Sequence, residues 1–349
     1  MKGKRWLWWL SALLVVLALA TVAAGCGGDD DEEEEAAPAE TGAATDTGAA
    51  AESIRVGLVT DIGGLNDRGF NELANSGIER AVDELGVESR VLESKSDADY
   101  IPNLSQLAEE GYELIISNGF LMGEATEQAA GEFAESNFAI IDFAYESPPP
   151  NLLGLVFKEQ EVGYLAGYLA AKMSESGTVS TVGGQKIPPV DRFIAGFQAG
   201  AKAANPDIET LNGYSQDFVD QAKCKEVALD QIAKGSDVVF QVAGGCGLGA
   251  LDAAQEKSVW GIGVDKDQAF LGDHILTSAV KRVDEAVFQT VEKAATGEFE
   301  GGVTSFGLAE EGVGLGEISD QVDQAILDEL EEQEQMIIDG EVTIPETVP

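Results

Sequence analysis

The chain has 349 residues, 44% of them hydrophobic, and its 63 acidic and 21 basic residues give a formal net charge of −42. So negative a field argues against nucleic acid and anionic lipid as partners and for a neutral or cationic ligand, although selection for solubility in a salty or acidic medium explains it equally. A single histidine rules out a multi-histidine metal site, and we expect no metal, no cofactor and no catalytic residues.

The first 25 residues have the pattern of a secretory signal peptide. Three basic residues precede a nearly unbroken apolar run from Trp6 to Val22, and small residues then lead to Cys26. We expect cleavage before Cys26 and lipidation of that cysteine, although Ala23 stands where leucine is commonest in such signals. A retained membrane anchor is the alternative, because a run of about 17 residues is borderline for a membrane span.

Residues 26–52 are predicted to form a disordered acidic tether after the lipidated cysteine. The run Asp29 to Glu35 is followed by small and acidic residues with almost no large apolar side chain, and such a segment cannot bury enough surface to fold. As a flexible chain it would span roughly 25–30 Å. These features predict a lipoprotein outside the cytoplasm, anchored to the cell membrane through Cys26.

From residue 54 onward, short apolar strands alternate with helical patterns. Strands are expected at 54–60, 89–93, 114–117 and 138–142, with helices at 70–85, 101–110 and 124–136. After three prolines at 148–150, strands are expected at 152–157, 178–182, 209–214, 237–242 and 260–264, with helices at 161–173, 193–204, 222–234, 248–256 and 318–338. This alternation is typical of βαβ units and a mostly parallel sheet. Two such units in series predict an α/β protein of two lobes with a cleft between them.

Polar and glycine-rich segments follow several of the expected strands. In open α/β sheets, ligands bind where strands end and loops lead into helices. The segments are Asp61–Asn71, Ser117–Phe120, Asp142, Gln216–Asp220, Gly244–Gly247 and Asp265–Gln268. Each taken alone also fits a helix cap, but their common place in the pattern predicts a ligand site.

A dinucleotide-binding enzyme is a competing interpretation of one of these segments. Gly245, Gly247 and Ala250 follow a strand with the spacing of a Rossmann fingerprint, and Asp265 lies 20 residues beyond the first glycine. The match is weak because no partner for hydride transfer stands out and Cys246 would lie where a pyrophosphate must pass. We therefore expect a binding protein and not an NAD-dependent dehydrogenase.

Four segments, in this order, resemble the BMP family of ABC-transporter substrate-binding lipoproteins, which includes the purine nucleoside receptor of spirochaetes. They are Gly57–Asn71, Ser94–Tyr100, Gly261–Gln268 and Thr277–Asp284, within a match from about residue 54 to Pro345. The resemblance implies a type I periplasmic-binding fold with a ligand between the lobes. The N-terminal lobe would comprise residues 53–157 and about 279–302, and the C-terminal lobe residues 158–278 and about 303–345.

The resemblance also implies that a purine base lies between two aromatic rings. Phe70 and Phe218 would stack on the two faces of the base, since offset stacking adds to burial, although Phe70 also fits a core position of its helix. Asn71 and Asp142 would hydrogen-bond the edge of the base, where buried polar groups reject a base that lacks their partners. Asp61 would line the same cleft.

The sugar would be bound by a second set of residues. Asp265 would accept a hydrogen bond from one ribose hydroxyl and Lys281 would donate to another, although a solvated surface is the alternative for the lysine. Gly244 and Gly245 would let the backbone approach the sugar. Asn118 would line the cleft nearby.

With Cys26 lipidated, Cys224 and Cys246 remain as a pair in an oxidising compartment. We expect a disulfide between them, with two free thiols as the alternative. Each cysteine would lie at the carboxyl edge of one of two adjacent strands, within the disulfide reach of about 4.4–6.8 Å between α-carbons. The bridge would then join the two loops that carry Phe218 and Gly244.

The expected mechanism is capture without catalysis. A monomeric two-lobed receptor would close on the nucleoside by hinge motion, and its closed form would dock on the membrane permease of an ABC importer. A nucleoside sensor or surface-binding lipoprotein without a role in transport is the alternative.

Overall fold

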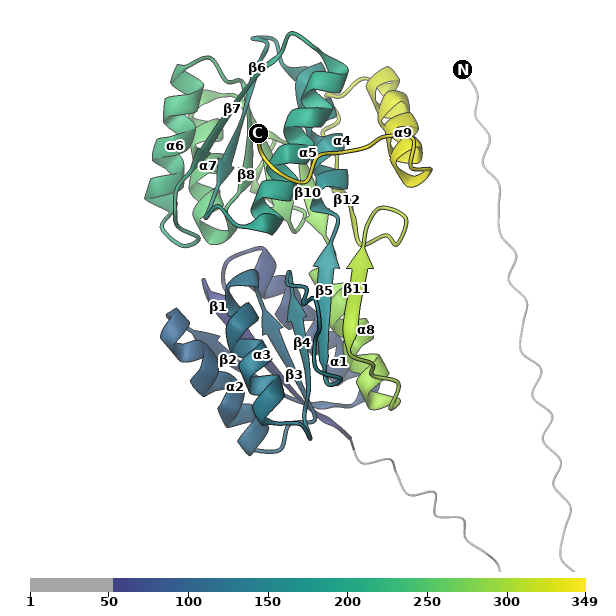
Figure 1. The fold of residues 1–349 in the computed structure, drawn as a ribbon. Helices are drawn as coiled ribbons and strands as arrows, with labels where there is room; N and C mark the ends of the chain where they lie inside the picture. Colours follow the sequence, from purple (N-terminus) through teal and green to yellow (C-terminus); the bar gives the residue numbers. More distant parts are fainter. Residues whose placement is uncertain (1–52) are drawn as a thin grey trace, which may run out of the picture. The chain divides into compact units, whose positions relative to one another are not determined.

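Two sheets of six strands each, flanked by helices, make up residues 53–349, which are the part of the chain that this computed structural model describes (Figure 1). The predicted signal peptide, lipidated Cys26 and tether lie outside the described residues. Within the described part, the predicted α/β fold with two mostly parallel sheets is confirmed.

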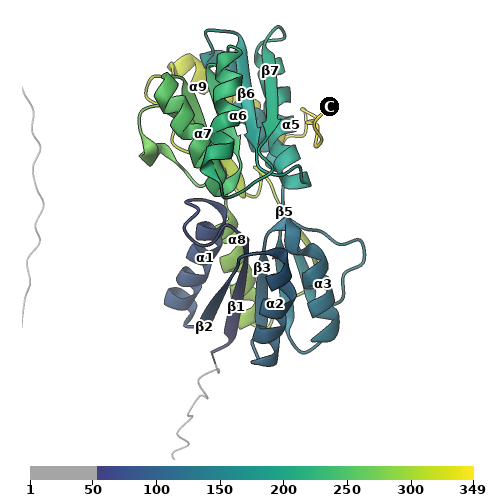
Figure 2. The ribbon, with the colours of Figure 1, turned by 90° about the vertical axis from the view of Figure 1, so that its left-hand side faces the viewer.

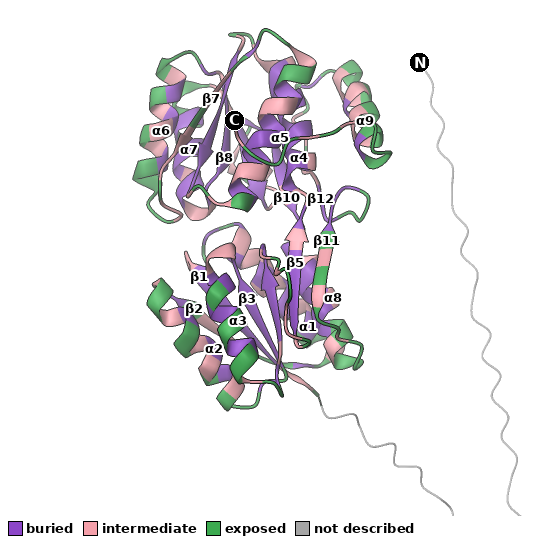
Figure 3. Cartoon of the chain, in the orientation of Figure 1, coloured by how far each residue is buried: buried purple, intermediate pink, exposed green. Residues whose placement is uncertain are grey.

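The first lobe has a wholly parallel sheet with the strand order β11-β5-β4-β3-β1-β2. Its strands are β1 (Arg55–Ile62), β2 (Glu88–Ser94), β3 (Leu114–Asn118), β4 (Asn137–Ile141), β5 (Leu152–Phe157) and β11 (Gly302–Phe306). Its helices are α1 (Phe70–Leu85), η1 (Asp97–Asp99), α2 (Tyr100–Glu109), η2 (Phe120–Met122), α3 (Gly123–Glu132) and α8 (Val283–Ala295). Helices α1 and α8 pack on one face of the sheet and α2 and α3 on the other (Figure 2), so the apolar strand β3 is buried along its whole length (Figure 3).

The second lobe has the strand order β12-β10-β9-β8-β6-β7, with β12 antiparallel to its neighbour. Its strands are β6 (Thr178–Gly183), β7 (Glu209–Tyr214), β8 (Val238–Val242), β9 (Trp260–Asp265), β10 (Ile275–Lys281) and β12 (Val313–Leu315). Its helices are α4 (Glu159–Met173), α5 (Pro188–Ala204), α6 (Gln221–Ala233), α7 (Gly244–Lys257), η3 (Ala269–Leu271) and α9 (Gln324–Ile338). The pairs α4 with α5 and α6 with α7 each pack side by side, on opposite faces of the sheet (Figure 1).

The chain passes between the sheets after β5, after β10 and after β11. The segment that returns to the first lobe begins and ends later than the expected residues 279 and 302. Strand β10 stays in the second sheet as far as Lys281, where it pairs with β12, and β11 pairs with β5 as far as Phe306. Backbone pairing therefore places the lobe boundaries near residues 282 and 307.

Several helix ends also differ from the expected ones. Helix α7 begins at Gly244 and not at residue 248, α5 begins at Pro188 and not at 193, α3 ends at Glu132 and not at 136, and α9 begins at Gln324 and not at 318. Proline suits the first position of a helix because its φ is already helical. Gly244, Gly245 and Gly247 lie in the first turn of α7, where Gly244 has a φ of 53° and a Cβ at Gly247 would lie 1.7 Å from Gln241 Oε1. A left-handed backbone at Gly244 and the lack of space for a Cβ at Gly247 explain two of these glycines.

Cys224 in α6 and Cys246 in α7 form a disulfide, with their α-carbons 5.6 Å apart. Both cysteines are buried. Cys246 lies in the first turn of α7 and not in the loop where it was expected, so the bridge joins two helices that begin at the same edge of the second sheet. Residues 53–349 contain no helix that is both long and apolar enough to cross a membrane.

Candidate ligand-binding cleft

A cavity lies where strands of both sheets end, and residues of both lobes line it. Of the ten residues predicted to bind ligand, nine line this cavity and Asn118 does not. The aromatic rings of Phe70 from the first lobe and Phe218 from the second both face this cavity. Phe120, which ends one of the predicted ligand-site segments, and Val190 and Phe193, which were not predicted, also line the cavity.

The start of helix α1 places Phe70 and Asn71 at the cavity. The Asp67 carboxylate accepts hydrogen bonds from the backbone N–H groups of Gly69 at 3.0 Å, Asn71 at 2.8 Å and Glu72 at 3.1 Å. These N–H groups have no partner within a helix, so an acidic cap fixes where α1 begins. Asp67 was not predicted to have this role, although an aspartate just before a helix is the usual signal for a cap.

Three polar side chains of the first lobe form a chain of hydrogen bonds at the cavity wall. Asn118 Nδ2 donates to Asn71 Oδ1 at 2.9 Å, and Asn71 Nδ2 donates to Asp61 Oδ1 at 3.1 Å. Asn118 is fully buried behind Asn71 and does not line the cavity. The prediction that Asn118 lines the cleft is therefore wrong; it orients Asn71, which keeps one N–H for a ligand.

Lys281 lies at the centre of a buried charge cluster. Its Nζ lies 2.8 and 2.9 Å from the two carboxylate oxygens of Asp142, 3.5 Å from Glu159 Oε1 and 3.9 Å from Asp265 Oδ1. Its ammonium also lies 4.8 Å from the centre of the Phe70 ring. Burial by itself would lower the pKa of Lys281, but the three carboxylates outweigh it and hold the pKa above its usual range. Lys281 is 2% exposed, which excludes the solvated-surface alternative.

Glu159 and Arg192 extend this cluster, and neither residue was predicted from the sequence. Glu159 is fully buried at the start of α4, and Arg192 Nε of α5 donates to its Oε2 at 2.6 Å. One Glu159 oxygen therefore faces Lys281 and the other faces Arg192. The two residues lie on different helices with no recognisable spacing, so no sequence pattern indicates their pairing.

Asp142 and Asp265 occupy matching positions in the two lobes. Asp142 follows β4 and Asp265 ends β9, and both have left-handed backbone conformations, with φ of 73° and 62°. Aspartate tolerates this conformation better than most residues. Such strain is common at binding sites, and here it accompanies two carboxylates that both approach Lys281.

Two buried carboxyl groups of the cleft, Asp61 and Asp265, have no cation at hydrogen-bond distance within the described part of the chain, and Lys281 Nζ lies 3.9 Å from Asp265. Burial raises the pKa of Asp61 to about 8 and that of Asp265 to about 7, because removal from water disfavours the carboxylate. The Asp142 carboxylate raises both pKa values further, whereas the Lys281 ammonium lowers them. Both groups therefore titrate near neutral pH.

We expect the ligand-free protein to lose stability as pH rises from about 4 to about 8. The ordinary pKa of 3.8 applies to the unfolded chain, so the cost of ionising Asp265 in the fold accumulates between pH 3.8 and about 7. Asp265→Asn removes this group and suits the left-handed backbone. Melting temperatures measured across this range should fall more steeply for the wild type than for the variant. Equal slopes of melting temperature against pH in the wild type and Asp265→Asn would contradict the raised pKa of Asp265.

The lobes contact each other beside the cavity. Lys266 Nζ of the second lobe lies 2.7 Å from Glu72 Oε1 of the first, and Gln268 Nε2 donates to the Arg68 carbonyl oxygen at 3.2 Å. Together with the Asp142–Lys281 pair, these contacts bridge the lobes on the side where their strands end. Groups from both lobes are thus close enough to bind one small molecule at once.

Two mostly parallel sheets joined by three crossovers, with a polar and aromatic cleft at their strand ends, define a type I periplasmic-binding protein. The family model for Bmp, described as ABC transporter substrate-binding protein PnrA-like, matches residues 54–348. The chain belongs to this family, which confirms the resemblance seen in its motifs.

Individual relatives match over most of their length. The CD4+ T-cell-stimulating antigen of Listeria monocytogenes is 36% identical over 314 residues, which cover 83% of this chain and 88% of that protein. The ABC transporter nucleoside-binding protein BmpA of Lactococcus lactis subsp. cremoris is 34% identical over 315 residues, covering 84% of this chain and 89% of that protein. A solved ABC transporter solute-binding protein from Aeropyrum pernix K1 has a TM-score of 0.79 at 29% identity, covering 85% of this chain and 94% of that one.

Family membership decides between the main functional classes. The protein is an ABC transporter substrate-binding protein and not an enzyme, so the dehydrogenase alternative is excluded. Proteins of this class work outside the cytoplasm. Gly245 and Gly247 lie in the first turn of α7, where Gly247 packs closely against Gln241.

Proposed function

We propose that this protein captures a purine nucleoside in the cleft and delivers it to the membrane permease of an ABC importer, while a lipid at Cys26 anchors it to the cell membrane. The observation that carries the proposal is the composition of the cavity, in which an aromatic ring from each lobe accompanies a buried set of carboxylates and one lysine. The Lactococcus lactis relative, named as a nucleoside-binding protein, supports the same class of ligand.

The base would lie between Phe70 and Phe218. A flat purine gains from burial of both faces and from offset stacking, which adds roughly 0.5–1.5 kcal/mol per aromatic pair. Asn71 has a free N–H and Asp61 has a second carboxylate oxygen for the edge of the base. Asp142 also remains available, since each of its oxygens keeps a lone pair beyond its bond to Lys281.

The sugar would lie toward Asp265 and Lys281. Asp265 accepts from a hydroxyl, and Lys281 can turn one N–H toward a second hydroxyl while it stays paired with Asp142. Gly244 and Gly245 leave space at the start of α7, because a Cβ at either would meet no atom closer than 3.5 Å. The excess of carboxyl groups disfavours a phosphate on the sugar, so we expect a nucleoside and not a nucleotide.

Replacing Phe70 with alanine should weaken nucleoside binding about 100-fold. Losing the burial and stacking of one ring costs about 3 kcal/mol, and each 1.4 kcal/mol is tenfold in Kd. Phe270→Ala is the matched control, because Phe270 is 58% exposed on η3 and does not line the cavity. Titration calorimetry with guanosine and inosine measures both variants. Equal affinities in Phe70→Ala and wild type would exclude stacking on this ring.

A further inference from the structure

We propose that the Cys224–Cys246 disulfide and the Asp217 carboxylate are positioning groups that hold Phe218 in its stacking place before a ligand arrives. The inference rests on the proposed function, because it takes Phe218 as one of the two stacking rings. It concerns residues 215–220, which connect β7 to α6 and are called the Phe218 loop here.

The Phe218 loop begins with bonds to the neighbouring strand end. Ser215 N–H donates to the Gly183 carbonyl at 2.9 Å, and Gln216 N–H donates to the Gly184 carbonyl at 3.0 Å. The Phe218 ring lies directly over Gly184, where a Cβ would be 2.3 Å from a ring atom. The loop thus leaves β7 along a defined path, and its aromatic ring packs on backbone.

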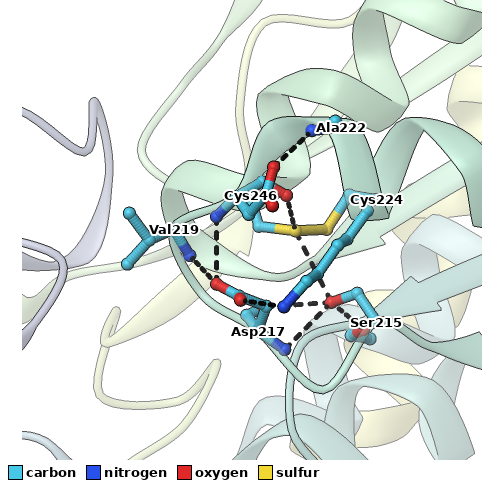
Figure 4. A network of polar contacts seen from close by, with 9 residues as sticks. Ser215, Asp217, Val219, Ala222, Cys224 and Cys246 are labelled. Atoms are coloured by element: carbon cyan, nitrogen blue, oxygen red, sulfur yellow. Dashed lines mark hydrogen bonds and ion pairs between the residues drawn. A yellow bond between two sulfur atoms is a disulfide. The ribbon is translucent and has the colours of Figure 1, made fainter.

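The Asp217 carboxylate closes a turn around Phe218 (Figure 4). Its Oδ1 accepts from the backbone N–H groups of Val219 at 2.8 Å and Asp220 at 2.9 Å, and its Oδ2 accepts from Lys223 Nζ at 2.7 Å. The Lys223 ammonium and the two N–H groups lower the pKa of Asp217 to about 2, so the carboxylate stays charged at any physiological pH. The residues that follow Phe218 are therefore tied to the side chain of the residue that precedes it.

Helix α7 fixes the loop from the other side. Cys246 N–H donates to the Phe218 carbonyl oxygen at 2.9 Å, and the disulfide joins Cys246 to Cys224 in the helix that follows the loop (Figure 4). The Asp220 carbonyl oxygen lies 2.9 Å from the Cys246 sulfur. The first turn of α7, which also brings Gly244 to the cavity, and the Phe218 loop therefore form one cross-linked unit.

Such cross-links matter for binding because a ligand must otherwise order the loop. Ordering a loop on binding costs free energy that would appear as lost affinity. Breaking the disulfide should therefore weaken binding although it removes no group that touches the ligand. This loss of affinity should occur only when the Phe218 ring is present, because the ring is the part of the loop that contacts the ligand.

A double-mutant cycle tests this dependence. We expect Cys224→Ala/Cys246→Ala to weaken guanosine binding about tenfold in the wild type and to have no further effect when Phe218→Ala is already present. Asp217→Ala should behave in the same way and serves as a second variant if the cysteine variant folds poorly. Val219→Ala is the control, because its side chain is 50% exposed and the substitution keeps the backbone N–H. An equal loss with and without the Phe218 ring, or no loss at all, would overturn the proposal.

Amide hydrogen exchange separates failure of this proposal from failure of the proposed function. If the wild type binds no purine nucleoside, the proposed function fails, and exchange in the ligand-free protein still decides the positioning role. The Val219 and Asp220 amides should exchange at least about tenfold faster in the double cysteine variant, while the amides of β8 keep their rates. Unchanged exchange at these two amides would show that the disulfide does not order the loop.

Discussion

Replacing Lys281 with methionine is expected to abolish ligand binding and to lower the free energy of unfolding by about 3–5 kcal/mol. The substitution keeps an unbranched apolar stem but leaves Asp142 and Glu159 buried without the ammonium that lies 2.8 and 3.5 Å from them. Arg192 still faces Glu159, so the Asp142 carboxylate loses the most. Urea denaturation followed by circular dichroism, together with titration calorimetry, measures both effects.

Lys266→Met provides the matched control for this prediction. Lys266 also forms an ion pair between the lobes, but its side chain is 35% exposed, so its loss should cost less than about 1 kcal/mol. Adding Asp142→Asn to Lys281→Met should restore part of the stability, because it removes the unpaired charge and asparagine tolerates the left-handed backbone at this position. A Lys281→Met protein as stable as Lys266→Met would contradict the buried cluster.

Replacing Gly167 with alanine should destabilise the protein by about 3 kcal/mol, at the upper end of the range for overpacking. Helices α4 and α5 meet at glycines: a Cβ at Gly167 would lie 1.9 Å from the Phe197 carbonyl oxygen, and one at Gly200 would lie 1.9 Å from the Tyr164 carbonyl oxygen. Since both obstacles are backbone atoms, the helices must move apart to make room. These helices also carry Glu159 and Arg192, so separation would disturb the charge cluster.

Gly131→Ala is the control for the helix contact. Gly131 lies in α3 with nothing within 4 Å of its would-be Cβ, so alanine there should stabilise the protein by about 0.4–1 kcal/mol through its helix propensity and reduced unfolded-state entropy. Thermal and urea unfolding compare the two variants. A neutral or stabilising Gly167→Ala would show that α4 and α5 do not pack as closely as described.

Much of the fold follows from local patterns in the sequence. The structure has α1, β5 and β7 with the bounds that their apolar periodicity and flanking breakers predict. The location of the cleft was predictable for a related reason: parallel strands present their carboxyl ends at one edge, so polar residues after successive strands converge there. Phe70 and Asp265 reach the cavity by this rule.

The parts that could not be predicted depend on contacts between distant elements. Glu159 and Arg192 become a buried pair only because α4 and α5 touch. Asn118 follows a strand like its neighbours, yet the side chain of Asn71 lies between it and the cavity. The early start of α7 could not be predicted because glycines usually indicate a loop, whereas here Gly244 begins the helix with a left-handed backbone and Gly247 admits a close contact with Gln241.

The most direct test of the central claim is titration calorimetry of the purified protein, unfolded and refolded to remove carried-over ligand, against guanosine, inosine, adenosine, cytidine, ribose and NAD. Saturable one-to-one binding of purine nucleosides, with much weaker binding of cytidine and ribose, is the expected result. Such a pattern requires a site that recognises both a purine base and its sugar. If the refolded protein binds no purine nucleoside, or binds ribose as tightly as guanosine, the aromatic cleft is not a nucleoside site.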